Sequence, residues 1–242
     1  MEDNRGFLSK GTDYRLLTLT TWPKAVLFDL DGTLLDNSAV VVEAYYTGMK
    51  KLGYEPKDKK FIKTLLGRST YNTGRGLGLK EEDLPAIDTH FWDFFGSYAN
   101  TLKGSPVVYE SIPEILKLFH ERNIPMGICT SNQASSARIL IQKAGLSSYI
   151  SAYVGSEDLP ERKPDPQPLQ LLLSKLEIPI PKNRNENLWF VGDTAPDVLA
   201  ARNAGLKSIA VPDKVNLDSV KETNPDLLLD SMTQFFGLLR TI

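Results

Sequence analysis

The chain has 242 residues, and its 28 lysines and arginines almost balance its 30 aspartates and glutamates. This balance excludes a general nucleic-acid-binding protein, which needs a basic surface to displace counterions from phosphates. Apolar residues make up 41% of the chain, but no apolar run approaches the ~20 residues of a membrane span. One cysteine, Cys129, excludes a disulfide framework and a multi-cysteine zinc site. Because the first residues contain no apolar region typical of a signal peptide, we expect a soluble, cytoplasmic protein.

Residues 1–22 are polar and mixed, and we expect an N-terminal extension that is poorly ordered at its start. Short continuous apolar runs follow at 25–30, 125–129, 152–155, 188–192 and 208–211. None of them alternates apolar with polar residues. Such runs are typical of strands that are buried on both faces of a parallel sheet. Cys129 lies inside one of these runs, so we interpret it as a small buried apolar residue and not as a nucleophile.

Helical patterns separate these runs. Residues 111–114 (Ser-Ile-Pro-Glu) predict a capping box at the start of one helix. Further helices are predicted over 135–144, 166–176 and 196–204, with Gly145 and Gly205 placed where left-handed C-terminal caps are expected. The alternation of strands and helices predicts an α/β protein with a doubly wound, mostly parallel, Rossmann-like sheet.

The interval between the first two runs is too long for a simple crossover. Helical patterns at 38–53, 57–66 and 80–102 predict a small α-helical cap domain over 39–105. The α/β core domain would then comprise 23–38 and 106–242. We expect the aromatic residues at 91–98 to form the core of the cap. The glycine-rich segment 74–78 lacks the spacing of a phosphate-binding loop and is interpreted as a flexible loop of the cap.

Polar side chains follow the predicted strands, where ligands bind in open α/β sheets. They are Asp29, Asp31 and Thr33 after the first strand, Thr130, Ser131 and Asn132 after the second, Glu157, Asp158, Arg162 and Lys163 after the third, and Asp193, Thr194 and Asp197 after the fourth. We expect these groups to converge on one crevice.

The residue types in this crevice indicate phosphate chemistry. The carboxylates of Asp29, Asp31 and Asp193 would repel one another unless a cation lay among them, and oxygen ligands favour Mg²⁺. Thr130 can donate a hydrogen bond to a phosphoryl oxygen, and Lys163 supplies a positive charge. Asp29 can act as a nucleophile that forms an aspartyl-phosphate. Asp31 can exchange protons with the leaving oxygen and with water, provided that its pKa is raised.

These residues resemble the motifs of the haloacid dehalogenase-like (HAD) superfamily. Segment 28–36 (FDLDGTLLD) is similar to the first motif, Thr130 to the second and segment 163–166 (KPDP) to the third. Segment 192–197 (GDTAPD), followed by alanines and a glycine up to residue 205, is similar to the fourth. The match covers about 24–213. It is most similar to the phosphoglycolate-phosphatase-like branch, in which a helical cap is inserted after the first motif.

The resemblance implies a Mg²⁺-dependent phosphatase that hydrolyses a small phosphorylated metabolite. Asp29 would be the nucleophile and a metal ligand. Asp31 would be the acid/base, with its backbone carbonyl on the metal. Asp193 would complete the metal site, and Asp197 would act in its outer shell or as a further ligand.

The resemblance also implies a phosphate-binding set. It consists of Thr130 with its neighbours Ser131 and Asn132, and of Lys163, which would hold the nucleophile and the phosphate together. In this branch a cap loop of the Gly67–Arg68 type enters the active site and helps to select the substrate. Arg68 would meet a second anionic group of the substrate there. The alternative is an ordinary surface arginine.

Other functions remain open. A phosphomutase of a sugar phosphate uses the same site, although Gly192-Asp193 differs from the Glu-Asp pair towards which related mutases tend. A pyrophosphatase or a nucleotidase would also share this site. A catalytically silent binding or regulatory protein would need neither Asp31 nor a cap. We expect a monomer or weak homodimer with no nucleic-acid or membrane partner.

Overall fold

A computed structural model of the chain describes residues 19–66 and 69–242. Its centre is a six-stranded parallel sheet in the order β3-β2-β1-β4-β5-β6. The strands are β1 (Ala25–Phe28), β2 (Met126–Cys129), β3 (Ala152–Val154), β4 (Asn185–Gly192), β5 (Leu206–Ala210) and β6 (Leu227–Leu228). The predicted parallel sheet is confirmed, and each of the five apolar runs overlaps one of its strands. Only β6, which is two residues long, is too short to give a pattern.

The strand order reverses direction between β1 and β4. From β1 the chain adds β2 and β3 on one side, and then β4, β5 and β6 on the other. Ligands of open α/β sheets bind at the carboxyl ends of the strands beside such a switch point. The polar residues that follow β1 and β4 therefore lie at the position that the topology favours for a binding site.

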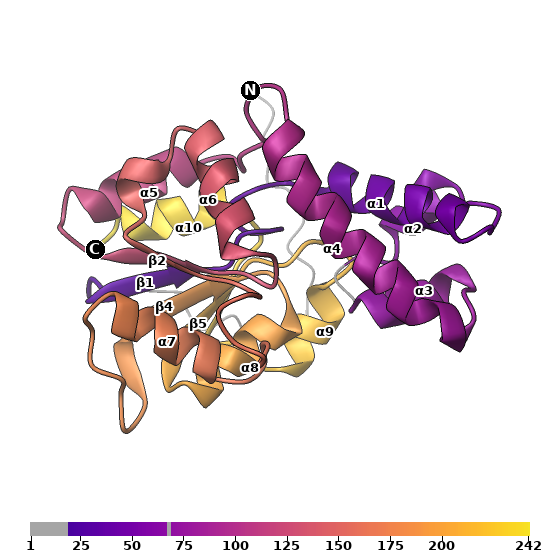
Figure 1. Ribbon diagram of the computed structural model, residues 1–242. Coiled ribbons are helices and arrows are strands. Elements are labelled where there is room, and N and C mark those ends of the chain that lie inside the picture. The colour runs from indigo at the N-terminus through magenta and orange to yellow at the C-terminus, as the bar shows by residue number, and fades with distance from the viewer. Residues whose placement is uncertain (1–18, 67–68) are drawn as a thin grey trace, which may run out of the picture.

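Helices cover both faces of the sheet (Figure 1). One face packs against α5 (Ile112–His120), α6 (Ala134–Lys143) and α10 (Met232–Leu239), and the other against α7 (Gln167–Lys175) and α8 (Ala195–Asn203). A short helix, α9 (Leu217–Glu222), packs against α8, and η2 (Ser147–Tyr149) is a single turn of 3-10 helix. Apolar cover on both faces explains why the strands read as continuous apolar runs.

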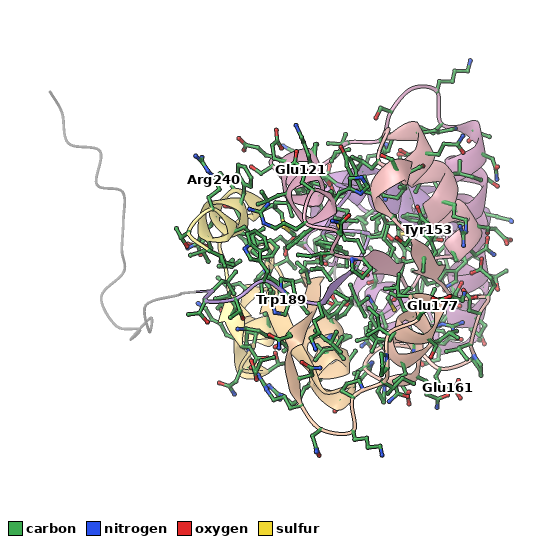
Figure 2. The ribbon with its side chains drawn as sticks, turned by 90° about the vertical axis from the view of Figure 1, so that its left-hand side faces the viewer. Glu121, Tyr153, Glu161, Glu177, Trp189 and Arg240 are labelled. Atoms are coloured by element: carbon green, nitrogen blue, oxygen red, sulfur yellow. The ribbon has the colours of Figure 1, made fainter. Side chains whose placement is uncertain are left out.

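An aromatic cluster fills the layer beneath α5 and α10. Phe119 is fully buried, and its ring lies 6.0 to 6.3 Å from the rings of Trp22, Phe28, Trp189 and Phe235. Figure 2 shows Trp189 inside this layer, at the end of the molecule away from the cap. Because Trp22 and the buried Leu19 pack on the core, the expected extension over 1–22 is anchored at least from residue 19.

Of the two predictions about helix ends, the left-handed glycine caps are confirmed and the capping box is wrong. Gly145 and Gly205 adopt φ values of 73° and 74° just after α6 and α8, which agrees with the predicted left-handed caps. The capping box predicted at Ser111 was wrong. Ser111 has φ 66°, and its hydroxyl lies 3.2 Å from that of Thr233 on α10, so a tertiary contact replaces the local cap.

The segment between β1 and β2 contains the expected helical insertion. Its elements are α1 (Ser38–Lys51), α2 (Lys59–Lys63), α3 (Thr70–Leu77), the 3-10 turn η1 (Glu81–Asp83) and α4 (Leu84–Thr101). They share an apolar cluster of their own and stand to one side of the sheet (Figure 1). This separate cluster supports a cap domain over 39–105, and the exact boundary stays a prediction. The name cap below means α1 to α4 with their connections.

The flexible loop expected at 74–78 was wrong. Residues 74–77 belong to α3, and Gly78 ends this helix with φ 86°. A β-carbon on Gly74 would lie 2.7 Å from the side chain of Leu84 on α4, so the small residue allows close helix packing. Glycine destabilises an isolated helix, but at position 74 its lack of a side chain allows α3 to pack closely on α4.

Helix α4 joins the cap to the core. Phe91 and Phe95 are buried in the cap cluster, as expected, whereas Tyr98 packs against the core. At the C-terminal end of α4, the ammonium of Lys143 donates hydrogen bonds to the carbonyls of Ala99 and Leu102 at 3.0 and 2.7 Å. Within 19–66 and 69–242, no helix combines the length and the apolar character that a bilayer crossing demands.

We predict that Phe119→Ala lowers the free energy of unfolding by about 3–5 kcal/mol, because it leaves a cavity among four aromatic rings. Phe61→Ala is the matched control, since that ring is 45% exposed on α2. Urea unfolding followed by circular dichroism measures both variants. Equal losses in the two would contradict the proposed position of the aromatic cluster.

We predict that Cys129 does not react with a thiol reagent in the native protein at pH 8. Burial raises the pKa of its thiol to about 12, so the native chain holds roughly a thousandfold less thiolate than the unfolded one. Labelling with 5,5′-dithiobis(2-nitrobenzoate) should release one equivalent of chromophore only after denaturation in guanidinium chloride. Rapid labelling of the folded chain would show that β2 is not buried on both faces.

Candidate active site

A cavity of about 750 Å³ lies between the carboxyl ends of the strands and the cap. From the core it is lined by the predicted residues Asp29, Asp31, Ser131, Asn132, Lys163, Asp193 and Asp197. From the cap it is lined by α1, α3 and α4, including Tyr45, Thr70, Asp88 and Trp92. Thr130 lies beside this cavity, with its hydroxyl 3.5 Å from the Asp31 carboxylate. The structure thus brings the strand-end residues together, while Gly67 and Arg68 lie outside the described residues.

Lys163 is the positive centre of this site. Its Nζ lies 2.5 Å from Oδ1 of Asp29 and 2.6 Å from Oδ1 of Asp197, and all three side chains are buried. Burial by itself lowers the pKa of the ammonium, but the two carboxylates outweigh burial and hold the pKa well above its ordinary value. Lys163 is therefore a permanent cation that links the end of β1 to the start of α8.

Asp31 lies in the turn after β1, where the side-chain amide of Asn37 donates a hydrogen bond to its carboxylate. Burial raises the pKa of Asp31, and the hydrogen bond from Asn37 opposes that rise. The sequence reasoning did not identify Asn37. Its position directly before α1, six residues after Asp31, is a signal that could have found it.

Asp193 follows β4 and is held from two sides. Its oxygens accept hydrogen bonds from the hydroxyl of Thr33 at 3.1 Å and from the side-chain amide of Asn216 at 3.3 Å. Gly32 has φ 90°, and a β-carbon there would lie 2.4 Å from Oδ2 of Asp193. Only glycine fits this turn. Thr33 was expected in this crevice, whereas Asn216 is a further site residue that sequence reasoning missed, although it follows β5 at the same edge of the sheet.

The carboxylates fit a hard cation. One oxygen each of Asp29, Asp193 and Asp197 lies within 4.8 Å of the others, and all three residues are buried. Burial raises the pKa of Asp29 to about 7, and burial together with the charges of Asp29 and Asp197 raises the pKa of Asp193 well above its ordinary value. One ammonium does not offset this crowding, whereas a divalent cation would. A donor set of oxygens alone suits Mg²⁺.

Asp197 has other partners for both oxygens. Oδ1 accepts a hydrogen bond from Lys163, and Oδ2 accepts from the backbone N–H and the hydroxyl of Thr194 at 2.9 and 2.5 Å. The bond from the Thr194 N–H is one half of a capping box at the start of α8, whose other half joins the backbone N–H of Asp197 to the Thr194 side chain. These bonds favour an outer-shell role for Asp197, in which it orients Lys163.

The segment after β2 is suited to donate hydrogen bonds to the oxygen atoms of a ligand. The hydroxyl of Thr130 accepts a hydrogen bond from the backbone N–H of Asn132 at 3.0 Å, which turns the chain into the cavity. The amide nitrogen of Asn132 is buried and has no hydrogen-bond partner among the described residues. A buried donor without a partner is costly, so this nitrogen is suited to an acceptor brought by a ligand.

The expectation that Glu157 and Asp158 join the same crevice was wrong, since neither lines the cavity. The carboxylate of Glu157 accepts hydrogen bonds from the backbone N–H groups of Ala134 and Ser135 at the start of α6. Asp158 forms an ion pair with Lys175 at 2.7 Å. Both acids stabilise local structure and do not contribute to the crowded charge at β1 and β4.

The sequence matches the family model of the haloacid dehalogenase-like hydrolases over residues 26–211. A phosphoglycolate phosphatase of Photobacterium profundum is 29% identical over 90% of this chain and 96% of its own length. A phosphoglycolate phosphatase of Rhodospirillum rubrum is 30% identical, over 78% of this chain and 79% of its own. These matches extend well beyond the motifs and include the cap.

Solved structures share the fold. A complex of CbbY from Rhodobacter sphaeroides with xylulose-1,5-bisphosphate superposes with a TM-score of 0.68 at 19% identity, over 88% of this chain and 96% of that one. A HAD-superfamily hydrolase from Ehrlichia chaffeensis superposes with a TM-score of 0.62 at 20% identity, over 92% and 98%. The family match, the relatives and the shared fold agree with one another. The chain therefore belongs to the haloacid dehalogenase-like hydrolases, and it is an enzyme of the phosphatase type.

Proposed function

We propose that this chain is a Mg²⁺-dependent phosphatase that hydrolyses a small phosphomonoester through an aspartyl-phosphate on Asp29. The observation that carries this proposal is the contact between Asp29, Lys163 and the crowded carboxylates at the end of β1 and β4. Mg²⁺ bound by Asp29, Asp193 and the backbone carbonyl of Asp31 would supply positive charge to the phosphoryl oxygens. The phosphoglycolate phosphatases among its relatives act on a substrate of this size class.

The residues divide the work between two steps. In the first, a carboxylate oxygen of Asp29 attacks phosphorus, the phosphorus–oxygen bond of the ester breaks, and Asp31 gives its proton to the leaving alcohol. In the second, Asp31 takes a proton from water, the oxygen of that water attacks phosphorus, and the bond to Asp29 breaks. Inorganic phosphate leaves, Asp29 is again a free carboxylate, and Asp31 holds a proton.

The other polar groups hold the phosphoryl group in place. Thr130, Ser131 and the amide nitrogen of Asn132 would donate hydrogen bonds to its oxygens, and Lys163 would contact both Asp29 and the phosphoryl group. Closure of the cap over the cavity would exclude bulk water from the aspartyl-phosphate. We infer that the enzyme acts in the cytoplasm as a monomer or weak homodimer.

We predict that Asp29→Asn abolishes hydrolysis of p-nitrophenyl phosphate without unfolding the chain. An amide of the same shape keeps the volume of the side chain but cannot attack phosphorus, so kcat should fall by at least about a thousandfold. Circular dichroism and thermal unfolding check the fold, and phosphate release measures turnover. Activity that persists in this variant would contradict the mechanism.

We predict that Mg²⁺ raises the melting temperature of the wild-type chain. Binding to the folded state alone stabilises it by about 2.7 kcal/mol when the ion is at a hundred times its dissociation constant. Asp193→Asn should remove most of this shift, because the variant loses a ligand. Asp158→Asn is the matched control, since this acid pairs with Lys175 away from the site and should keep the shift. If Mg²⁺ raised the melting temperature of both variants equally, the ion would bind at a site that does not include Asp193.

A further inference from the structure

The cavity above the reacting carboxylates extends well into the cap. Its volume is about 750 Å³. Asp29 and Lys163 line its core side, and α1, α3 and α4 line its other side. A phosphoryl group at Asp29 would occupy only the core side. The alcohol half of a substrate must then contact the cap, whose side chains decide which alcohol binds.

Asp88 is a carboxylate that α4 presents to this cavity. Its Oδ1 accepts hydrogen bonds from the hydroxyl of Thr70 on α3 and from the indole N–H of Trp92, the latter at 3.2 Å. Two donors on different helices therefore fix the orientation of the carboxylate. Its Oδ2 accepts no hydrogen bond from the described part of the chain. The half-buried Asp88 is thus a preorganised acceptor on the cap wall.

The rest of the cap lining that the structure describes is neutral. Within the described residues, Asp88 is the only charged side chain that α1 to α4 contribute to the cavity, alongside hydroxyls and the rings of Phe91, Trp92 and Phe95. The lining cations, Arg162 and Lys163, belong to the core. Arg162 donates hydrogen bonds to backbone carbonyls, and Lys163 pairs with Asp29 and Asp197.

This distribution of charge favours an alcohol half that carries hydroxyls over one that carries a carboxylate. A carboxylate on the substrate would approach the like charge of Asp88, which disfavours binding. A hydroxyl would donate a hydrogen bond to a carboxylate oxygen, and such charge-assisted bonds are stronger than neutral ones. The rings of Phe91, Trp92 and Phe95 supply apolar surface for the carbon chain that carries the hydroxyls.

We propose that Asp88, held by Thr70 and Trp92, is a specificity-determining residue that accepts a hydrogen bond from a hydroxyl of the substrate. The substrates of this chain are then monophosphates of polyols or sugars. This inference rests on the proposed phosphatase function and names the substrate class of the same site. It differs from the role expected for Arg68, which would favour a second anionic group.

The experiment compares pairs of esters that differ only in hydroxyl groups. Glycerol 3-phosphate is paired with propyl phosphate, and ribitol 5-phosphate with pentyl phosphate, each with the full chain and Mg²⁺. We expect kcat/KM to be higher for the hydroxylated member of at least one pair by about tenfold or more. In Asp88→Ala this ratio should fall close to one. The kcat/KM for phosphoglycolate, relative to pentyl phosphate, should rise because a like charge has gone.

Two further variants control for indirect effects. Asp93→Ala removes the same charge from an exposed position on the same helix, so it should keep the wild-type ratios. If Asp88→Ala proves unstable by circular dichroism, Asp88→Asn replaces it, since its amide oxygen can still accept from Thr70 and Trp92. Asp88→Asn should retain part of the preference for hydroxyls and lose the discrimination against phosphoglycolate.

Several results would overturn the inference. The first is a ratio of kcat/KM between hydroxylated and plain esters that is the same in wild type and in the Asp88 variants. The second is a higher kcat/KM for phosphoglycolate than for the polyol phosphates. The third is a preference for phosphoethanolamine, whose ammonium would take the place of the hydroxyl. Failure of the proposed function has a different signature. In that case neither p-nitrophenyl phosphate nor any ester of the panel would be hydrolysed with Mg²⁺, and both proposals would be wrong.

Discussion

Crowded negative charge at the switch point of the sheet is the constraint on which the rest of the structure depends. Asp29, Asp193 and Asp197 lie within 4.8 Å of one another and are buried, so each raises the free energy of its neighbours in the charged state. Flexible segments would relax by moving these groups apart. Here they follow a rigid parallel sheet, whose strand ends bring them together.

The surrounding residues oppose this relaxation in specific ways. Lys163 pairs with Asp29 and Asp197 and so ties β1 to α8. Gly32 leaves room for the Asp193 carboxylate, which a β-carbon would displace. The capping box at Thr194 satisfies the start of α8 and orients Asp197 at the same time. The same crowding supports the proposed binding of a divalent cation, which would in turn attract a phosphate.

The core side and the cap side of the cavity contain different kinds of residues. The core side contains the residues that resemble the family motifs, and these explain phosphoryl transfer without identifying the alcohol. Likeness of fold does not choose a substrate. The described cap side contains Asp88 and neutral hydroxyl and aromatic groups, and in the proposed function it would contact the part of the substrate that varies between phosphate esters. The proposal therefore assigns reaction and specificity to elements that are separate in the sequence.

The sequence by itself determined the sheet, because strands buried on both faces must read as continuous apolar runs. It also determined the core side of the site, since Asp29, Thr130, Lys163 and Asp193 each follow a strand in a recognisable order. Residues at the carboxyl ends of parallel strands meet at one edge whatever the details of packing. The chemistry of oxygen ligands then follows from the residue types alone.

Only the tertiary structure decided what depends on contacts between distant segments. Asn37 and Asn216 donate hydrogen bonds to Asp31 and Asp193, and the folded chain alone shows which carboxylate each asparagine contacts. Residues 74–77 are helical because Gly74 lets α3 pack closely on α4, although glycine disfavours an isolated helix. Asp88 faces the cavity because Thr70, on another helix, holds it there. Such positions are set by packing between helices, which the spacing of residues in one segment does not contain.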